Sequence, residues 1–167
     1  MFRSTCLALI ALTLPAAGFA APLELKPSSD WEMSYDMEAC RLMRSFGEGD
    51  EKVVIHFTRY MPELGLEIIV AGKMLAPRGS SFKYRFAPGD EPNEARNPLF
   101  GERDDGVTAW QFNTGLIPQK EYKKLSDDSI ITAKMRTDLE QQRAAEIRSF
   151  EILRGEQQSV SLATGSM

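Results

Sequence analysis

Cysteine and histidine are the side chains of this sequence best suited to nucleophilic chemistry, and both are scarce. Cys40 is the only cysteine after residue 20, and His56 is the only histidine. A catalytic Cys–His pair needs hydrogen-bond contact at about 3 Å between the two side chains. The two residues lie in neighbouring alternating segments, residues 39–46 and 52–60, which the glycine-containing stretch GEGDE joins.

The apolar pattern of these two segments predicts a β-hairpin and its register. When the numbers of paired residues sum to 99, one face collects an apolar set that consists of Cys40, Leu42, Phe46, Val53, Ile55 and Phe57. A slip of one residue would turn the apolar set of one strand away from the core. His56 then pairs with Met43 on the opposite face, where we expect it to be exposed, so the sequence predicts no catalytic pair. Arg44 interrupts the apolar face, and we expect it to pair with a carboxylate or to lie at a sheet edge.

Other site chemistries find little support in the residue types and spacings. Zinc sites take three or four protein ligands, mostly Cys and His, which this chain lacks. The stretches GEGDE and GERDDG offer carboxylates to calcium, but neither has the ligand spacing of an EF-hand loop. Glycoside hydrolysis needs only two carboxylates, and no pair stands out among the 24 acidic residues. We therefore predict no catalytic, cofactor-binding or metal-binding residue, and we interpret the chain as non-enzymatic and without a cofactor.

Period-two alternation of apolar and polar residues indicates the strands that position these side chains. It marks residues 31–37, 39–46, 52–60, 66–72 and 81–86, which we expect to form an antiparallel meander of five strands. Another strand is expected over residues 107–117, and two more flank GEQQ, the last one still running where the chain ends. Residues 137–150 predict one short helix, capped by Thr137 or Asp138. The predicted fold is mainly β, an antiparallel meander that forms a small sandwich or open barrel, with one short helix near the C-terminus.

The strands carry most of the aromatic residues, and we interpret these residues as core rather than as the lining of a ligand cleft. Cross-strand aromatic packing would dominate the stability of a small β domain. The set comprises Trp31, Tyr35, Phe82, Tyr84, Phe86, Trp110 and Phe112. In residues 31–37 the alternation puts Met33 and Met37 on the same face as Trp31 and Tyr35, and we expect that face to be buried. Residues 87–106, rich in proline, glycine and acidic side chains, are interpreted as a long loop of the kind that is often functional or mobile.

The first twenty residues have the three-part pattern of a secretory signal peptide. Arg3 supplies the positive charge, an apolar run follows, and Gly18 and Ala20 are the small residues before the cut. Cleavage after Ala20 would leave residues 21–167 as a single β-rich domain in the periplasm, without membrane insertion. The sequence has 20 basic against 24 acidic residues, and loss of Arg3 takes the net charge to about −5, which argues against nucleic-acid binding.

Removal of the signal peptide would leave Cys40 as an odd cysteine in an oxidising compartment, where structural cysteines usually occur in pairs. The residues alone are compatible with three states of Cys40: an intermolecular disulfide, a buried free thiol, or a disulfide to a partner beyond Met167.

Three motifs make the chain resemble a known group of exported proteins. They are LKPSS before Trp31, a cysteine followed by R.FG.GD, and the terminal L.TGSM. Over residues 23–75 and 159–167 the chain resembles the amino-terminal region of exported α-proteobacterial proteins, some of which are described as energy transducer TonB. A TonB-like domain follows in those proteins, whereas this chain ends at Met167. The resemblance implies a domain truncated at its C-terminal end, and a disulfide from Cys40 to a cysteine beyond the chain.

We therefore expect a non-enzymatic exported envelope domain, an accessory or interaction module of a TonB-like energy transducer system with envelope proteins as its partners. A periplasmic small-ligand binding domain and an uncharacterised hydrolase are the alternatives. An enclosed apolar cavity would favour the first of these, and two carboxylates within about 5 to 10 Å of each other in a cleft would favour the second.

Overall fold

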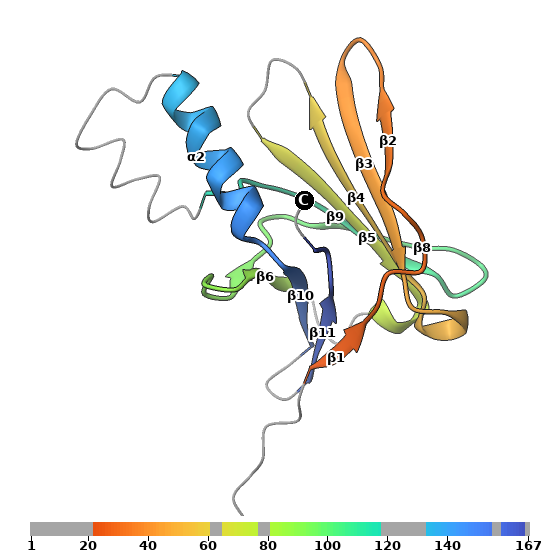
Figure 1. The fold of residues 1–167 in the computed structure, drawn as a ribbon. Helices are drawn as coiled ribbons and strands as arrows, with labels where there is room; N and C mark the ends of the chain where they lie inside the picture. Colours follow the sequence, from red (N-terminus) through yellow and green to blue (C-terminus); the bar gives the residue numbers. More distant parts are fainter. Residues whose placement is uncertain (1–21, 61–64, 77–80, 118–132, 155–157, 166–167) are drawn as a thin grey trace, which may run out of the picture.

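A computed structural model describes residues 22–60, 65–76, 81–117, 133–154 and 158–165 of the chain (Figure 1). Two β-sheets and one helix make up this part of the protein. The predicted signal peptide, residues 1–20, lies outside the described residues, as does Met167.

The larger sheet has six strands in the order β2-β3-β4-β5-β9-β8. Its strands are β2 (Glu32–Tyr35), β3 (Ala39–Phe46), β4 (Val53–Tyr60), β5 (Leu66–Gly72), β8 (Leu99–Glu102) and β9 (Thr108–Thr114). All neighbouring strands in it are antiparallel. Strands β2 to β5 form a meander, as the alternation predicted.

The smaller sheet has five strands in the order β1-β11-β10-β6-β7. Its strands are β1 (Leu23–Leu25), β6 (Lys83–Ala87), β7 (Asn93–Glu94), β10 (Ser149–Arg154) and β11 (Gln158–Leu162). The prediction that β6 is the fifth strand of the meander is wrong, because β6 pairs with β10 and β7 instead. Its aromatic side chains pack across the larger sheet rather than beside it, as the 4.7 Å distance between the ring centroids of Tyr84 and Phe112 shows.

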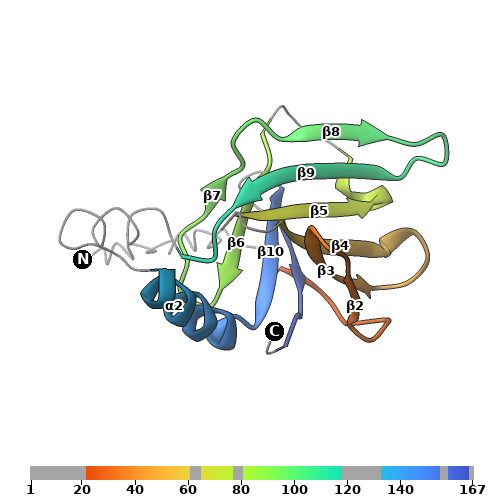
Figure 2. The ribbon, with the colours of Figure 1, turned by 90° about the horizontal axis from the view of Figure 1, so that it is seen from above.

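The two sheets enclose one hydrophobic core. Figure 2 shows β6 and β10 running steeply across the strands of the larger sheet. The ring of Phe57 lies 6.5 Å from that of Phe150, and the ring of Phe82 lies 5.3 Å from that of Trp110. The fold is therefore mainly β, with two packed sheets that form no closed barrel within the described residues.

The β3–β4 hairpin has the predicted register. Phe46 lies opposite Val53, and Cys40 lies opposite Arg59. Gly47 in the connection has a φ of 65°, in the left-handed region that favours glycine. The apolar pattern of both strands was thus sufficient to predict this hairpin.

Two other strand predictions need correction. The predicted buried face of residues 31–37 is exposed, because the smaller sheet packs opposite β4 and β9 and leaves β2 uncovered. Tyr35 is accordingly not a core residue, whereas Trp31 is half-buried against Phe46 and Phe57. Residues 87–106 are not one long loop, since β7 and β8 lie within them. Both are exposed edge strands, which lack the alternation that burial of one face imposes.

The predicted helix exists but is displaced towards the N-terminus. Helix α2 runs over Ala133–Glu146, so Thr137 and Asp138 lie inside it and do not cap it. It begins early because Ala, Lys, Met and Arg at positions 133–136 are good helix formers. It ends before Ile147, which enters the core, and Phe150 belongs to β10. The last strand is also shorter than expected, since β11 ends at Leu162.

Arg44 pairs with backbone oxygens rather than with a carboxylate. Its Nε donates to the backbone oxygen of Ser29 at 2.9 Å, and its Nη1 donates to that of Thr164 at 3.2 Å. Its guanidinium carbon lies 5.3 Å from the ring centroid of Trp31, within the range of a cation–π contact. Arg44 therefore joins the segment before β2 to the segment after β11.

Candidate functional site

Cys40 and His56 lie on opposite faces of the larger sheet and form no pair. Cys40 is a half-buried free thiol on the inner face, which packs on the smaller sheet. His56 has Met43 and Ile69 as cross-strand neighbours on the outer face. It is half-buried rather than exposed, and this burial lowers its pKa. The two residues best suited to nucleophilic chemistry therefore do not cooperate.

A polar cleft lies between α2 and the ends of β6 and β9, and we call it the α2 cleft. Its volume is about 470 Å³, and its lining includes Tyr84, Asp90, Glu94, Arg96, Asn113 and Glu140. A smaller hollow of about 240 Å³ adjoins it, and Asp90 and Ile117 line both. Both hollows are open to solvent and polar groups form at least half of the lining of each, so neither is an enclosed apolar cavity.

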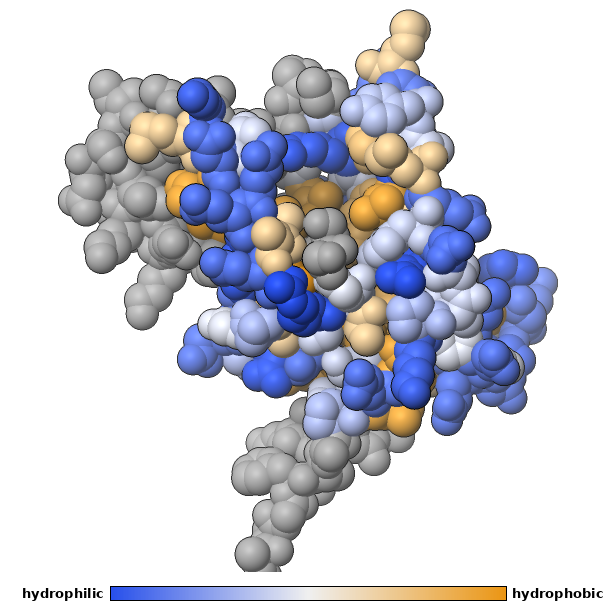
Figure 3. Space-filling model, viewed as in Figure 1, coloured by the Kyte–Doolittle hydropathy of each residue, from blue (hydrophilic) through white to orange (hydrophobic). Residues whose placement is uncertain are grey.

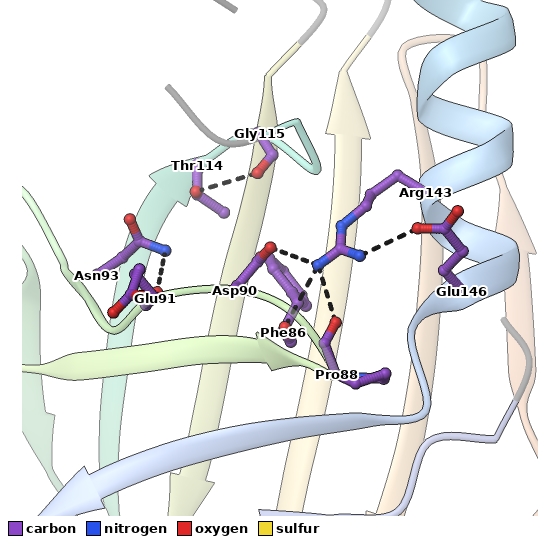
Figure 4. Close-up of polar contacts among 9 residues, drawn as sticks. All are labelled: Phe86, Pro88, Asp90, Glu91, Asn93, Thr114, Gly115, Arg143 and Glu146. Atoms are coloured by element: carbon purple, nitrogen blue, oxygen red, sulfur yellow. Dashed lines mark hydrogen bonds and ion pairs between the residues drawn. The ribbon is translucent and has the colours of Figure 1, made fainter. Parts of the chain in front are cut away.

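Arg143 of α2 joins the helix to the turn that follows β6 (Figure 4). Its guanidinium group forms an ion pair with Asp90. Its Nη2 also donates hydrogen bonds to the backbone oxygens of Phe86 and Pro88, at 3.4 and 3.3 Å. On the helix itself, Glu146 accepts a hydrogen bond from Nη1 at 3.2 Å. The side chains of Arg143 and Asp90 are only 14% and 6% exposed, so this ion pair is largely removed from solvent.

Glu140, one turn earlier on α2, reaches the other sheet. Its Oε2 accepts a hydrogen bond from Nη2 of Arg59 on β4 at 2.5 Å, and its Oε1 accepts one from Nε of Arg136 at 3.4 Å. The Glu140 side chain is 7% exposed. The two groups of ion pairs therefore tie α2 to β4 in the larger sheet and to the end of β6 in the smaller one.

The buried carboxylates of the α2 cleft act as anchors for the helix. Asp90 and Glu140 both bind arginines that come from other elements. The third lining carboxylate, Glu94, is exposed at the rim. Groups that a ligand could reach include the exposed side-chain amides of Asn93 and Asn113. The arrangement suits hydrogen bonding to a polar molecule better than acid–base catalysis.

Tyr84 forms part of the floor of the cleft. Its hydroxyl group and that of Thr114 lie 2.6 Å apart in a hydrogen bond. Burial is the main cause that raises the pKa of Tyr84, and the negative charge of Asp90 adds to it. The phenol therefore stays protonated at neutral pH and donates a hydrogen bond to Oγ1 of Thr114, which links β6 to the end of β9 across the two sheets.

No group of three or more His, Cys, Asp or Glu side chains that could hold a metal ion occurs among the described residues. Within that part of the chain, no helix has the length and the apolar character needed to cross a bilayer.

A second candidate site is the free edge of the larger sheet at β2. Three apolar side chains of β2 and its turn are exposed, Met33 by 67%, Tyr35 by 79% and Met37 by 99%. We call these three residues the β2 edge surface. Figure 3 shows hydrophobic atoms that project at the upper right of the molecule, where Figure 1 places the β2–β3 hairpin. Exposed apolar side chains on an unpaired strand are typical of interaction sites.

Asp36 holds the turn of this hairpin in one conformation. Its Oδ1 accepts hydrogen bonds from the backbone N–H groups of Glu38 and Ala39, at 3.0 and 2.7 Å, and its Oδ2 forms an ion pair with Arg41. The hydrogen bond from Arg41, followed by those from the two backbone groups, lowers the pKa of Asp36. The turn therefore presents Met37 to solvent in an ordered hairpin.

Sequence reasoning missed both places, for different reasons. The α2 cleft depends on ion pairs between residues 53 and 81 positions apart, which charge patterning along the chain does not reveal. The exposure of β2 had one signal, because residues 31–37 open the meander and the first strand of a meander can remain an edge.

Comparison with protein-family models, with curated proteins and with solved structures finds no match for this chain.

Proposed function

We propose that the protein is a non-enzymatic interaction domain that binds another protein through the β2 edge surface. The observation that carries the proposal is the exposure of Met33, Tyr35 and Met37 on a hairpin that Asp36 holds in shape. Burial of a large apolar side chain contributes roughly 1.5–3 kcal/mol. A partner that covers all three side chains would therefore gain several kcal/mol from this surface alone.

Export to the periplasm, and a role as an accessory or interaction module of a TonB-like system, belong to the same proposal. Their support comes from the sequence. The signal-peptide pattern of residues 1–20 favours export, and the resemblance over residues 23–75 and 159–167 favours the TonB-like setting, with envelope proteins as partners.

Capture of a partner from the periplasm tests the proposal. The full chain is expressed with an affinity tag, partners are crosslinked in cells, and the recovered proteins are identified and then purified for direct binding. The Met33→Ser/Tyr35→Ser double variant should lose the partner. A matched control, Leu99→Ser/Phe100→Ser, removes exposed apolar side chains from β8 at the opposite edge of the same sheet and should keep it. Equal binding by the wild type and both variants would overturn the proposal.

A polar small ligand in the α2 cleft is the second candidate function. The cleft volume of about 470 Å³ lies within the range of about 300–1,000 Å³ that is usual for ligand sites. A ligand found by thermal-shift screening should bind less tightly to Asn113→Ala, and equally well to Gln141→Ala, an exposed position outside the cleft lining. The hydrolase alternative has no comparable observation in its favour, since the buried carboxylates of the cleft already bind arginines.

A further inference from the structure

Strand β2 offers free backbone groups as well as exposed side chains. The N–H of Asp36 donates to the backbone oxygen of Ala39 at 3.0 Å, so these two residues form a hydrogen-bonded pair of the β2–β3 ladder. Hydrogen-bonded and non-hydrogen-bonded pairs alternate along an antiparallel ladder. Tyr35 and Met33 therefore belong to non-hydrogen-bonded pairs, and their N–H and C=O groups point towards the free edge of the sheet.

The side chains of the same two residues point to the inner face of the sheet. Met33 lies opposite Leu42, and Tyr35 lies opposite Cys40, both of which are on the inner face. A strand added at the free edge would place every second side chain beside Met33 and Tyr35. Apolar residues at those positions of the added strand would continue the hydrophobic face.

The outer face of β2 carries one carboxylate, that of Glu32. Glu32 is exposed, and it forms no ion pair within the described residues. The same holds for Asp30 before the strand and for Glu38 in the turn, whereas Asp36 is paired with Arg41. Basic side chains on an added strand would therefore meet opposite charges that the hairpin leaves unpaired.

The other sheet edges are protected against strand addition. The N–H of Arg103 donates to the backbone oxygen of Val107, so by the same alternation the backbone N–H and C=O groups of Phe100 and Glu102 point towards the free edge of β8. Pro98 precedes β8 and Glu102 ends it, and prolines and charged residues on an edge strand are both common means of blocking strand addition. The edges of the smaller sheet, β1 and β7, have only three and two residues. Strand β2 is longer than β1 and β7, has no proline within it or directly before it, and carries one charged residue, Glu32.

We infer that an extended segment of another protein adds to β2 as a further strand, with apolar residues opposite Met33 and Tyr35 and basic residues at the alternate positions. This inference rests on the proposed function and specifies the chemistry of the partner. A second copy of this chain fits less well, because pairing of β2 with itself would bring acidic residues of both strands onto one face.

Substitution by proline tests the backbone part of the inference. Met33→Pro removes an outward N–H and puts its ring where the added strand would lie, while no hydrogen bond to β3 is lost. Met33→Leu keeps the N–H, and Phe100→Pro makes the equivalent change at the β8 edge. The probe is a fluorescent, end-blocked peptide of alternating valine and lysine, whose binding to the full chain is measured by anisotropy. Met33→Pro should weaken binding by about tenfold or more, and the two controls by less than about twofold.

Modified peptides test the same inference without changing the protein. N-methylation of the valines removes the donors used in antiparallel addition, and N-methylation of the lysines removes those used in parallel addition, so one of the two should abolish binding. Replacement of lysine by glutamate should weaken binding, because Glu32 on the outer face of β2, with Asp30 and Glu38 beside the strand, would repel it. Thermal melting of each variant shows whether it is folded.

Several results would overturn the inference. Unchanged binding of both N-methylated peptides would exclude strand addition, and equal binding of the glutamate peptide would exclude a basic partner. A dimer of the chain that Met33→Pro disrupts would assign the edge to a second copy. A natural partner that is lost with Met33→Ser/Tyr35→Ser but kept with Met33→Pro would contradict strand addition alone and leave the proposed function standing.

Discussion

The ion pair between Arg143 and Asp90 should be the main attachment of α2, and Arg143→Met tests this. Methionine keeps most of the aliphatic stem of arginine, so the change removes the charge and its hydrogen bonds more than it removes packing. The folded variant would retain the largely buried Asp90 carboxylate without the Arg143 charge, and the backbone oxygens of Phe86 and Pro88 without this donor.

The expected cost is large because both members of the pair are buried. Removal of one partner from a buried ion pair typically costs about 3–5 kcal/mol. An exposed pair gives the matched control. Arg103 and Asp105 lie 3.2 Å apart with side chains 76% and 50% exposed, and Arg103→Met should cost no more than about 0.5 kcal/mol.

Urea unfolding of the full chain measures the loss of stability, and amide hydrogen exchange locates it. The amides of α2 should lose more protection than those of β4 or β5, because the helix can detach from the sheets while the core stays folded. The double variant Arg143→Met/Asp90→Asn should recover about 1–3 kcal/mol, since it no longer buries the Asp90 carboxylate charge without the Arg143 guanidinium. A loss below about 1 kcal/mol for Arg143→Met, or no recovery in the double variant, would show that this ion pair is not the main attachment of α2.

Three further predictions concern the histidine, the signal peptide and the cysteine. Burial lowers the folded-state pKa of His56 from its usual value of 6.5, so the neutral form stabilises the fold, and this contribution is lost as the pH falls through that lowered pKa. Between about pH 7 and pH 5 the wild type should thus lose more stability in urea than His56→Gln does. Mass spectrometry of the exported protein should show cleavage after Ala20, and an intact N-terminus in the periplasmic fraction would contradict the signal peptide. Thiol titration should find one free Cys40 in residues 21–167 and none in an oxidised longer form with a cysteine beyond Met167.

The β3–β4 hairpin was predictable because its sequence excludes the alternatives. Both strands bury one face, so a slip of one residue would expose either Phe46 of β3 or Val53 and Phe57 of β4. Strand β9 was predictable for the same reason, since Trp110 and Phe112 alternate with polar residues over a buried face. The alternation of apolar and polar residues determines the register wherever both strands of a pair bury one face.

The burial of strand β2 could not be predicted from its alternation. Its alternation is as regular as that of β3, yet Met33 and Tyr35 face solvent. Alternation indicates that a strand has two different faces, but it does not tell what lies against either face. That depends on how far the smaller sheet extends, which is a property of the tertiary packing.

The helix was predictable in kind but not in position. Residues 137–150 do contain apolar side chains at helical spacing, but Phe150 packs against Tyr84 and Phe86 from β10. The aromatic residue thus contributes to the core from a strand, and pairing with β6 outweighs continuation of the helix. The α2 cleft follows from this boundary, because the helix ends where Ile147 enters the core and holds Arg143 beside the β6 turn.

The parallel pairing of β1 with β11 has a mechanical consequence. Leu23 lies opposite Val160 and Leu25 lies opposite Leu162, so a strand near the start of the described chain runs beside a strand near its end and in the same direction (Figure 1). Tension that draws residue 22 away from residue 165 therefore slides β1 along β11 and loads the hydrogen bonds between them simultaneously. In an antiparallel hairpin such as β10–β11, tension at the two open ends would break the bonds one after another. The domain should for this reason withstand more force when it is pulled between its two ends than when it is pulled across a hairpin.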